Sequence, residues 1–222
     1  MKYIYEMAMK GPWETVGDGL QYRIEEIDET LYLLFQYTVS DKDWAYNMDT
    51  LPVAYKGLME RSLWLFKVIG AFMKVPGVAK PYSSMPQVWR AHRGFATLYK
   101  SGRDEIIKKV MEKNPKKIII SGISQGAALA VLAHEDIWFS LSTLRDNLFT
   151  YAFAGPRVFW FPPKALRERL TNVTHVARRG DIVTMLPFWM WGFRHSYKKI
   201  KIGKFDLPWW THHEFKEYLD NL

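Results

Sequence analysis

A run of isoleucines that turns directly into a run of small residues constrains this chain more than any other stretch. Residues 118–130 read Ile-Ile-Ile-Ser-Gly-Ile-Ser-Gln-Gly-Ala-Ala-Leu-Ala. They predict a buried strand over 117–120 and a small-residue helix over 125–134, joined by a G-x-S-x-G turn. Such a turn, set between strand and helix, is typical of a strained geometry that lifts a serine hydroxyl above a sheet. Ser124 is therefore the candidate nucleophile, and Gly122 and Gly126 keep side chains out of a close strand–helix approach.

The rest of the chain alternates between segments with strand-like and helix-like patterns. Tyr22–Ile27 and Leu31–Tyr37 flank turn-forming residues and predict a β-hairpin. Further helices are predicted over 95–114, 165–170 and 212–222, and further strands over 148–153, 173–177 and 198–202. This alternation predicts an α/β fold with a mainly parallel central sheet flanked by helices. Since no repeat or low-complexity linker interrupts it, we expect residues 1–222 to form one domain.

Composition removes several classes of protein from consideration. The 222 residues include no cysteine, which excludes a disulfide framework, a thiolate metal site and a cysteine nucleophile. The net charge of +8 and the 10 tryptophans suggest either nucleic acid or a membrane surface as a partner. No nucleic-acid-binding motif accompanies the charge, so we expect no nucleic-acid partner.

No signal peptide or membrane-spanning segment is recognisable, and we expect a cytoplasmic protein, with leaderless export left open.

An activated serine needs a histidine base and an acid that orients the histidine. In hydrolases with this turn, the acid follows the serine in the sequence and the histidine follows the acid. Asp181 comes shortly after the strand predicted over 173–177, where a sheet displays functional loops. The competing acids are Asp136, Asp146, Glu168 and Asp206, of which the first three are interpreted as solvated surface charges. Residue order leaves three histidines open as the base, namely His195, His212 and His213.

Six blocks of the sequence, in the right order, resemble those of the class 3 lipases, which are fungal-lipase-like α/β-hydrolases. The resemblance extends from about residue 20 to the end of the chain. The blocks are Leu34–Met48 (F-R-G-T-x-S-x-x-D-W-x-x-N), Ala91–Phe95 (V-H-x-G-F), Gly122–Ala130 (G-H-S-L-G-G-A-L-A), Tyr151–Val158 (Y-T-F-G-x-P-R-V), Gly180–Pro187 (D-x-V-P-x-L-P) and His213–Leu219 (H-x-hydrophobic-x-x-Y-L). One block would be weak evidence, whereas six in order are specific.

The resemblance assigns roles to individual residues. It implies that Ser124 is the nucleophile, Asp181 the orienting acid and His213 the general base, with His212 as the alternative base. It also implies an oxyanion hole formed by Thr38 and by the backbone N–H of Gln125.

The sequence also departs from the family pattern. Gln36-Tyr37 replace the usual Arg-Gly before the oxyanion threonine, which makes the role of Thr38 less secure than that of Ser124. In the family, His92 and His195 correspond to histidines without a catalytic role. No metal or organic cofactor is expected.

These residues predict a serine carboxylic-ester hydrolase that acts through an acyl-enzyme, on lipid esters such as acylglycerols or on a small ester. The alternatives are a phospholipase-type acyl hydrolase, or a catalytically weak membrane-surface binding protein on the same fold. Ruling out the second alternative requires evidence that the serine reacts.

Two further stretches suggest contact with lipid. Residues 51–88 fall where class 3 lipases carry a lid, and the segment 63–74 is an apolar helix candidate interrupted by lysines. Between Arg178 and Lys204, seven Lys and Arg residues accompany a single acid, Asp181. Such a cluster beside tryptophans predicts peripheral contact with an anionic membrane surface, although a solvated basic strand explains the charges equally well.

Overall fold

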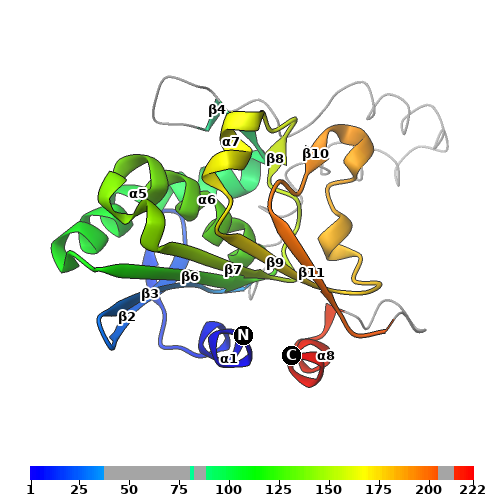
Figure 1. Cartoon of the computed structure of the whole chain (residues 1–222), viewed down its shortest axis with the longest axis horizontal. Coiled ribbons are helices and arrows are strands. Elements are labelled where there is room, and N and C mark those ends of the chain that lie inside the picture. The colour runs from blue at the N-terminus through cyan, green and yellow to red at the C-terminus, as the bar shows by residue number, and fades with distance from the viewer. Residues whose placement is uncertain (38–80, 83–88, 205–212) are drawn as a thin grey trace.

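The structure is a computed structural model that describes residues 1–37, 81–82, 89–204 and 213–222 (Figure 1). A seven-stranded sheet runs through this part of the chain. In spatial order its strands are β1 (Glu14–Val16), β2 (Leu20–Ile27), β3 (Thr30–Phe35), β6 (Lys117–Ile123), β7 (Leu148–Phe153), β9 (Val173–Arg178) and β11 (Lys198–Ile202). The five strands from β3 to β11 are parallel, and β1 and β2 are antiparallel at one edge. The predicted mainly parallel sheet is confirmed.

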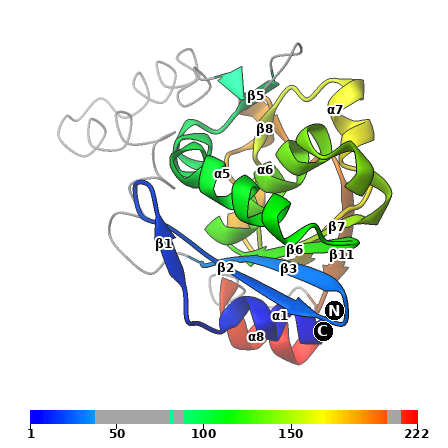
Figure 2. The ribbon, with the colours of Figure 1, turned by 90° about the vertical axis from the view of Figure 1, so that its left-hand side faces the viewer.

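Helices cover both faces of this sheet, as Figures 1 and 2 show. One face carries α5 (Arg93–Lys113), α6 (Gln125–Ser140) and α7 (Lys164–Arg169), and the other carries α1 (Lys2–Met9) and α8 (Phe215–Asn221). Each face has its own apolar core. The larger core joins the sheet to α5 and α6, while the smaller one includes Tyr5 of α1, Phe153 of β7 and Tyr218 of α8.

The N-terminal hairpin lies directly beside the strand that precedes Ser124. Asp28 and Glu29 form its turn with positive φ angles of 48° and 60°, and β2 and β3 pair on either side. β3 then pairs in parallel with β6, so that Phe35 lies opposite Gly122. The predicted hairpin is confirmed, and its position brings the chain segment that leads to Thr38 close to the candidate nucleophile.

A second sheet of four short strands was not predicted. Its strands, in spatial order, are β10 (Phe193–Arg194), β8 (Phe159–Trp160), β5 (Trp89–Ala91) and β4 (Pro81–Tyr82). It joins segments from before α5, after β7 and after β9. Three 3₁₀ helices complete the described elements: η1 (Ser142–Asn147), η2 (Val183–Met185) and η3 (Trp189–Trp191).

Three outcomes concern the ends and the predicted lid. No element was predicted over 2–16, where the structure has α1 and β1. The last helix was predicted from His212 but begins at Phe215, so that His213 precedes it. The predicted lid over 51–88 lies outside the described residues, apart from Pro81–Tyr82. Among the described helices, none combines the length and apolarity needed to span a bilayer.

Candidate active site

Ser124 occupies a strained turn between β6 and α6. Its φ of 55° and ψ of −118° place it in the left-handed region, which non-glycine residues rarely adopt. A hydrogen bond from its backbone N–H to the carbonyl of Phe153 (2.9 Å) holds the turn against β7. Gln125 is the first residue of α6, so its backbone N–H lies in the first turn, at the positive end of the helix dipole.

The two glycines of the motif allow this turn to form. A Cβ added to Gly122 would lie 2.3 Å from backbone atoms of Gly126, and one added to Gly126 would lie 2.5 Å from the carbonyl oxygen of Phe35. Neither contact can be relieved by moving a flexible side chain, because all the atoms concerned are backbone. The structure thus confirms that both glycines permit close approach.

His213 bridges the serine and the aspartate. Its Nε2 is 3.0 Å from the Ser124 Oγ, and its Nδ1 is 3.0 Å from Oδ2 and 3.1 Å from Oδ1 of Asp181. Because a carboxylate only accepts hydrogen bonds, Nδ1 carries the proton in the neutral ring and Nε2 is free to accept from the serine. The candidate nucleophile, base and orienting acid are therefore within hydrogen-bonding reach of one another.

Asp181 is held rigidly for this contact. It follows β9 and Gly180, whose φ of 86° turns the chain, and its side chain is fully buried. The backbone N–H of Val183 donates to its Oδ1 (2.9 Å), and the Thr184 hydroxyl donates to its backbone carbonyl (2.8 Å). These bonds keep both carboxylate oxygens directed toward the His213 ring.

Tyr218 is a further site residue to which the sequence analysis gave no role. Its hydroxyl donates to Asp181 Oδ2 (2.6 Å) and accepts from the backbone N–H of Arg178 (2.9 Å). Burial, and then the negative charge of Asp181, raise the pKa of Tyr218 well above its usual value, so it remains a protonated donor. The only signal in the sequence was its position in the His213–Leu219 block.

The remaining predicted site residues have different outcomes. Thr38 and His212 lie outside the described residues. His195 does not reach the serine: its Nε2 pairs with the carbonyl of Thr184 (2.8 Å) and its ring stacks on His175 at 4.2 Å between centroids. His92 caps α5, accepting from the backbone N–H of Phe95 (3.5 Å), in line with a structural role.

Three histidines are held neutral, of which His134 and His175 are fully buried and His195 is partly buried. Burial lowers the pKa of His134 to about 4 and that of His195 to about 3. Burial also lowers the pKa of His175 well below its usual value, and the neighbouring His195 adds to the effect. The hydrogen-bond partners of these rings are hydroxyl or carbonyl oxygens, none of which is charged.

Two interpretations of charged residues change. Asp136 was expected to be a solvated surface charge, but it is buried, pairs with Arg103 (2.7 Å) and accepts from the Tyr99 hydroxyl (3.1 Å). The expectation was wrong because both partners lie on α5, more than 30 residues earlier. Arg178, counted in the basic cluster, is neutralised by Glu217 of α8 (2.9 Å).

Among the described residues, no group of three His, Asp or Glu side chains converges as metal ligands would.

Comparison with known proteins identifies a family whose sequence model matches this chain. The family model for lipase (class 3) matches residues 32–191, which is more than half of the chain. A search of curated proteins finds no match.

Several solved lipases have a similar structure. The Rhizomucor miehei lipase in its propeptide complex aligns with a TM-score of 0.59 and 20% identity over 87% of this chain and 56% of that one. A triacylglycerol lipase whose catalytic centre is described as a serine protease triad aligns with a TM-score of 0.61 and 19% identity, over 87% and 66%. Lipase II from Rhizopus niveus aligns with a TM-score of 0.57 and 19% identity, over 86% and 64%.

The present chain spans between about half and two thirds of the length of these lipases. At this level of identity the likeness concerns the fold, and it confirms the predicted α/β-hydrolase architecture. The family match extends from within β3 to the end of η3 and includes Ser124 and Asp181. On that match, the chain belongs to the class 3 lipase family.

Proposed function

We propose that the chain is a serine carboxylic-ester hydrolase that works through an acyl-enzyme. The observation that carries the proposal is the continuous hydrogen-bonded chain from Ser124 through His213 to Asp181. This is the arrangement by which a weakly nucleophilic hydroxyl is activated by a neighbouring base. The serine protease triad of the triacylglycerol lipase with the same fold supports the same three roles here.

In the proposed reaction, His213 Nε2 takes the proton of the Ser124 hydroxyl as Oγ attacks the ester carbonyl carbon. The tetrahedral intermediate collapses when the carbon–oxygen bond to the alcohol breaks, and His213 returns its proton to the departing alkoxide. Water then attacks the acyl-enzyme, with His213 again as the base, and releases the carboxylic acid and free Ser124. Asp181 stays ionised throughout and stabilises the imidazolium.

We propose that the oxyanion of each intermediate is stabilised at the N-terminus of α6. The backbone N–H of Gln125 directly follows the nucleophile and lies at the positive end of the helix dipole, which supports its role as a donor. Thr38, the proposed second donor, lies outside the described residues, as does most of the proposed lid over 51–88.

Lipid esters such as acylglycerols are the proposed substrate class. Family membership and the likeness to a triacylglycerol lipase support this class. The loop after Asp181 also exposes Phe188, Trp189 and Met190, which suit contact with lipid. A phospholipase-type acyl hydrolase is the second candidate, and the positive charge near this loop favours it.

Peripheral contact with an anionic membrane surface is also proposed. Apart from Arg178, the cations between residues 178 and 204 form no ion pair with the described residues, which supports an external anionic partner. A protein that only binds membranes is disfavoured, because binding requires no aligned base behind a serine.

Labelling with a fluorophosphonate probe tests the hydrolase proposal, because the probe reacts with activated serines. We expect wild type to be labelled and Ser124→Ala not to be. Ser121→Ala is the matched control: it removes a serine three residues away, whose hydroxyl donates to the carbonyl of Tyr151 (2.9 Å), and should retain labelling. Equal labelling of wild type and Ser124→Ala would refute the proposal. Rates on p-nitrophenyl esters of short and long chains would then define acyl preference.

A further inference from the structure

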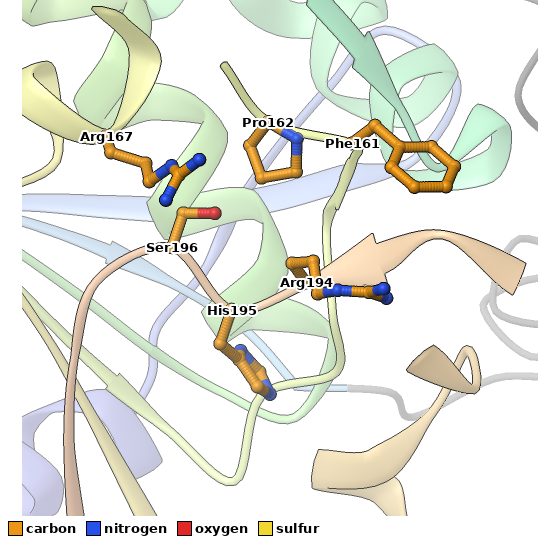
Figure 3. A pocket seen from close by; sticks show the side chains of 6 residues that line it. All are labelled: Phe161, Pro162, Arg167, Arg194, His195 and Ser196. Atoms are coloured by element: carbon orange, nitrogen blue, oxygen red, sulfur yellow. The ribbon is translucent and has the colours of Figure 1, made fainter. Parts of the chain in front are cut away.

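A cavity of about 410 Å³ opens between the β8–α7 connection and the β10–β11 connection. It is lined by Phe161, Pro162, Arg167, Arg194, His195 and Ser196. Figure 3 shows the Arg167 side chain directed toward Ser196, with Pro162 and Phe161 along the neighbouring wall and Arg194 beside Phe161. None of these residues belongs to the Ser124–His213–Asp181 arrangement, so the cavity is a separate feature of the molecule.

The charge of the cavity is positive and fixed. Arg167 and Arg194 are always protonated, and no carboxylate is among the described residues that line it. The His195 ring adds no charge, since burial lowers its pKa to about 3. The Arg167 guanidinium has no hydrogen bond or ion pair with the part of the chain that the structure describes. The Arg194 Nη1 donates to the carbonyl oxygens of Trp189 and Phe193, which leaves its charge without a carboxylate partner. Two guanidinium groups without a carboxylate favour an anionic ligand.

The surroundings strengthen this positive field. Arg157, which does not itself line the cavity, donates to the carbonyl oxygens of Met185 and Pro187 and has no acidic partner among the described side chains. Burial, and then the charge of Arg194, lower the pKa of Arg157, so the two cations lie close enough to repel each other. An anion bound between Arg167 and Arg194 would relieve part of that repulsion.

Ser196 supplies a second and independent observation. Its hydroxyl oxygen is buried and has no hydrogen-bond partner within the described ranges. Buried polar groups without a partner are rare and destabilising, so such a group calls for an explanation. An anionic oxygen in the cavity would accept a hydrogen bond from this hydroxyl.

The rim of the cavity is apolar and exposed. Phe161 is 60% exposed, and Trp189 is 59% exposed. The Arg194 guanidinium lies 5.7 Å from the centroids of both rings, so it joins the cavity to this rim. Met190 (54% exposed) extends the apolar surface. Aromatic side chains around a cationic pocket suit the boundary between lipid head groups and acyl chains.

We propose that this cavity binds the phosphodiester head group of an anionic phospholipid while Phe161 and Trp189 enter the bilayer. Arg167 and Arg194 would donate to the phosphate oxygens, and the Ser196 hydroxyl would donate to one of them. This deepens the membrane contact that rests on the proposed function, but it requires no turnover. The cavity would thereby fix which face of the protein meets the membrane.

Vesicle co-sedimentation tests the proposal, with Ser124→Ala as the background so that ester hydrolysis does not enter the result. We expect binding to phosphatidylcholine vesicles that contain phosphatidylglycerol and much weaker binding to phosphatidylcholine alone. Arg167→Gln should weaken binding by roughly tenfold or more, because it removes a charged hydrogen-bonding group. The matched control is Lys164→Gln on the same helix, whose side chain is 90% exposed and does not line the cavity. It should cost about fivefold or less.

Ser196→Ala separates a pocket from diffuse electrostatic attraction, because it leaves the charge unchanged. We expect it to weaken vesicle binding by about threefold to tenfold while leaving the melting temperature of the free protein equal or higher, since the lost hydroxyl had no protein partner. Equal losses for Arg167→Gln and Lys164→Gln, with none for Ser196→Ala, would overturn the pocket. Saturable binding of inorganic phosphate or glycerol phosphate without vesicle binding would overturn the lipid as its ligand.

Discussion

The imidazole ring of His213 and the rings of the buried residues His134 and His175 lie in opposite environments. The His213 side chain is 28% exposed and lies between the Asp181 carboxylate and the Ser124 hydroxyl. His134 and His175 are fully buried against uncharged oxygens, and burial lowers the pKa of each. The difference teaches what the proposed role of His213 requires: a carboxylate on one ring nitrogen and a proton donor on the other. Burial without the carboxylate produces a neutral structural ring instead.

The largest effect expected from this comparison concerns His213. We expect His213→Ala to lower kcat for p-nitrophenyl esters by roughly 10⁴-fold to 10⁶-fold, because the serine loses its base. The free energy of unfolding should change little, since the ring is partly exposed. His134→Gln is the control and should retain nearly full activity. Comparable losses in both variants would mean that the contrast between the rings has no catalytic meaning.

Acid sensitivity should come from the buried rings. His134 has a pKa of about 4 in the folded chain against 6.5 in the unfolded one, so below pH 6.5 the unfolded chain binds more protons. The contribution of this ring to the free energy of unfolding is therefore complete above pH 6.5. It falls by about 1.4 kcal/mol for each pH unit between 6.5 and 4.

Urea unfolding at several pH values measures this slope. His134→Gln should flatten it by about one proton while lowering stability at pH 7 by about 1–2 kcal/mol, because its two hydrogen bonds are only partly replaced. Lys164→Gln, which has no group titrating in this range, should keep the full slope. An unchanged slope in His134→Gln would show that the ring is protonated in the folded state.

The smallest effect concerns the carboxylate that distinguishes His213 from the other rings. Tyr218→Phe removes the hydroxyl that donates to Asp181, and we expect kcat to fall by about tenfold with KM unchanged. Tyr5→Phe is the matched control, because its ring stacks on Tyr218 but its hydroxyl donates to the carbonyl of Phe215 instead. If the two variants lose the same activity, Tyr218 acts through packing rather than through the carboxylate.

Local sequence patterns predicted the parts of the fold that depend on neighbouring residues. The strand, the serine turn and the small-residue helix around Ser124 follow from 13 consecutive residues, and the β2–β3 hairpin follows from its turn. The helix α1 was missed because its eight residues gain stability from packing against β6 and α8. These contacts join residues that are more than 100 positions apart in the sequence, so a local sequence pattern contains no sign of them.

The same distinction applies to the candidate site. Residue order and family blocks singled out Ser124, Asp181 and His213, and the structure places them within hydrogen-bonding distance. The partners of Tyr218 lie 37 and 40 residues away, so its hydrogen bonds could not be predicted. Ion pairing of Asp136 and Arg178 escaped prediction for the same reason, since each partner comes from a different helix.

The packing of α1 against α8 has a consequence for the order of events during synthesis. Tyr5 stacks on Tyr218 and donates to the carbonyl of Phe215, so α1, which is made before α8, holds the helix that follows His213. Translation produces Ser124 89 residues before His213. A ribosome-bound chain that has just completed α6 therefore carries the candidate nucleophile without its proposed base. Under the proposed mechanism, the nascent chain cannot hydrolyse esters until α8 packs against α1 and brings His213 to Ser124.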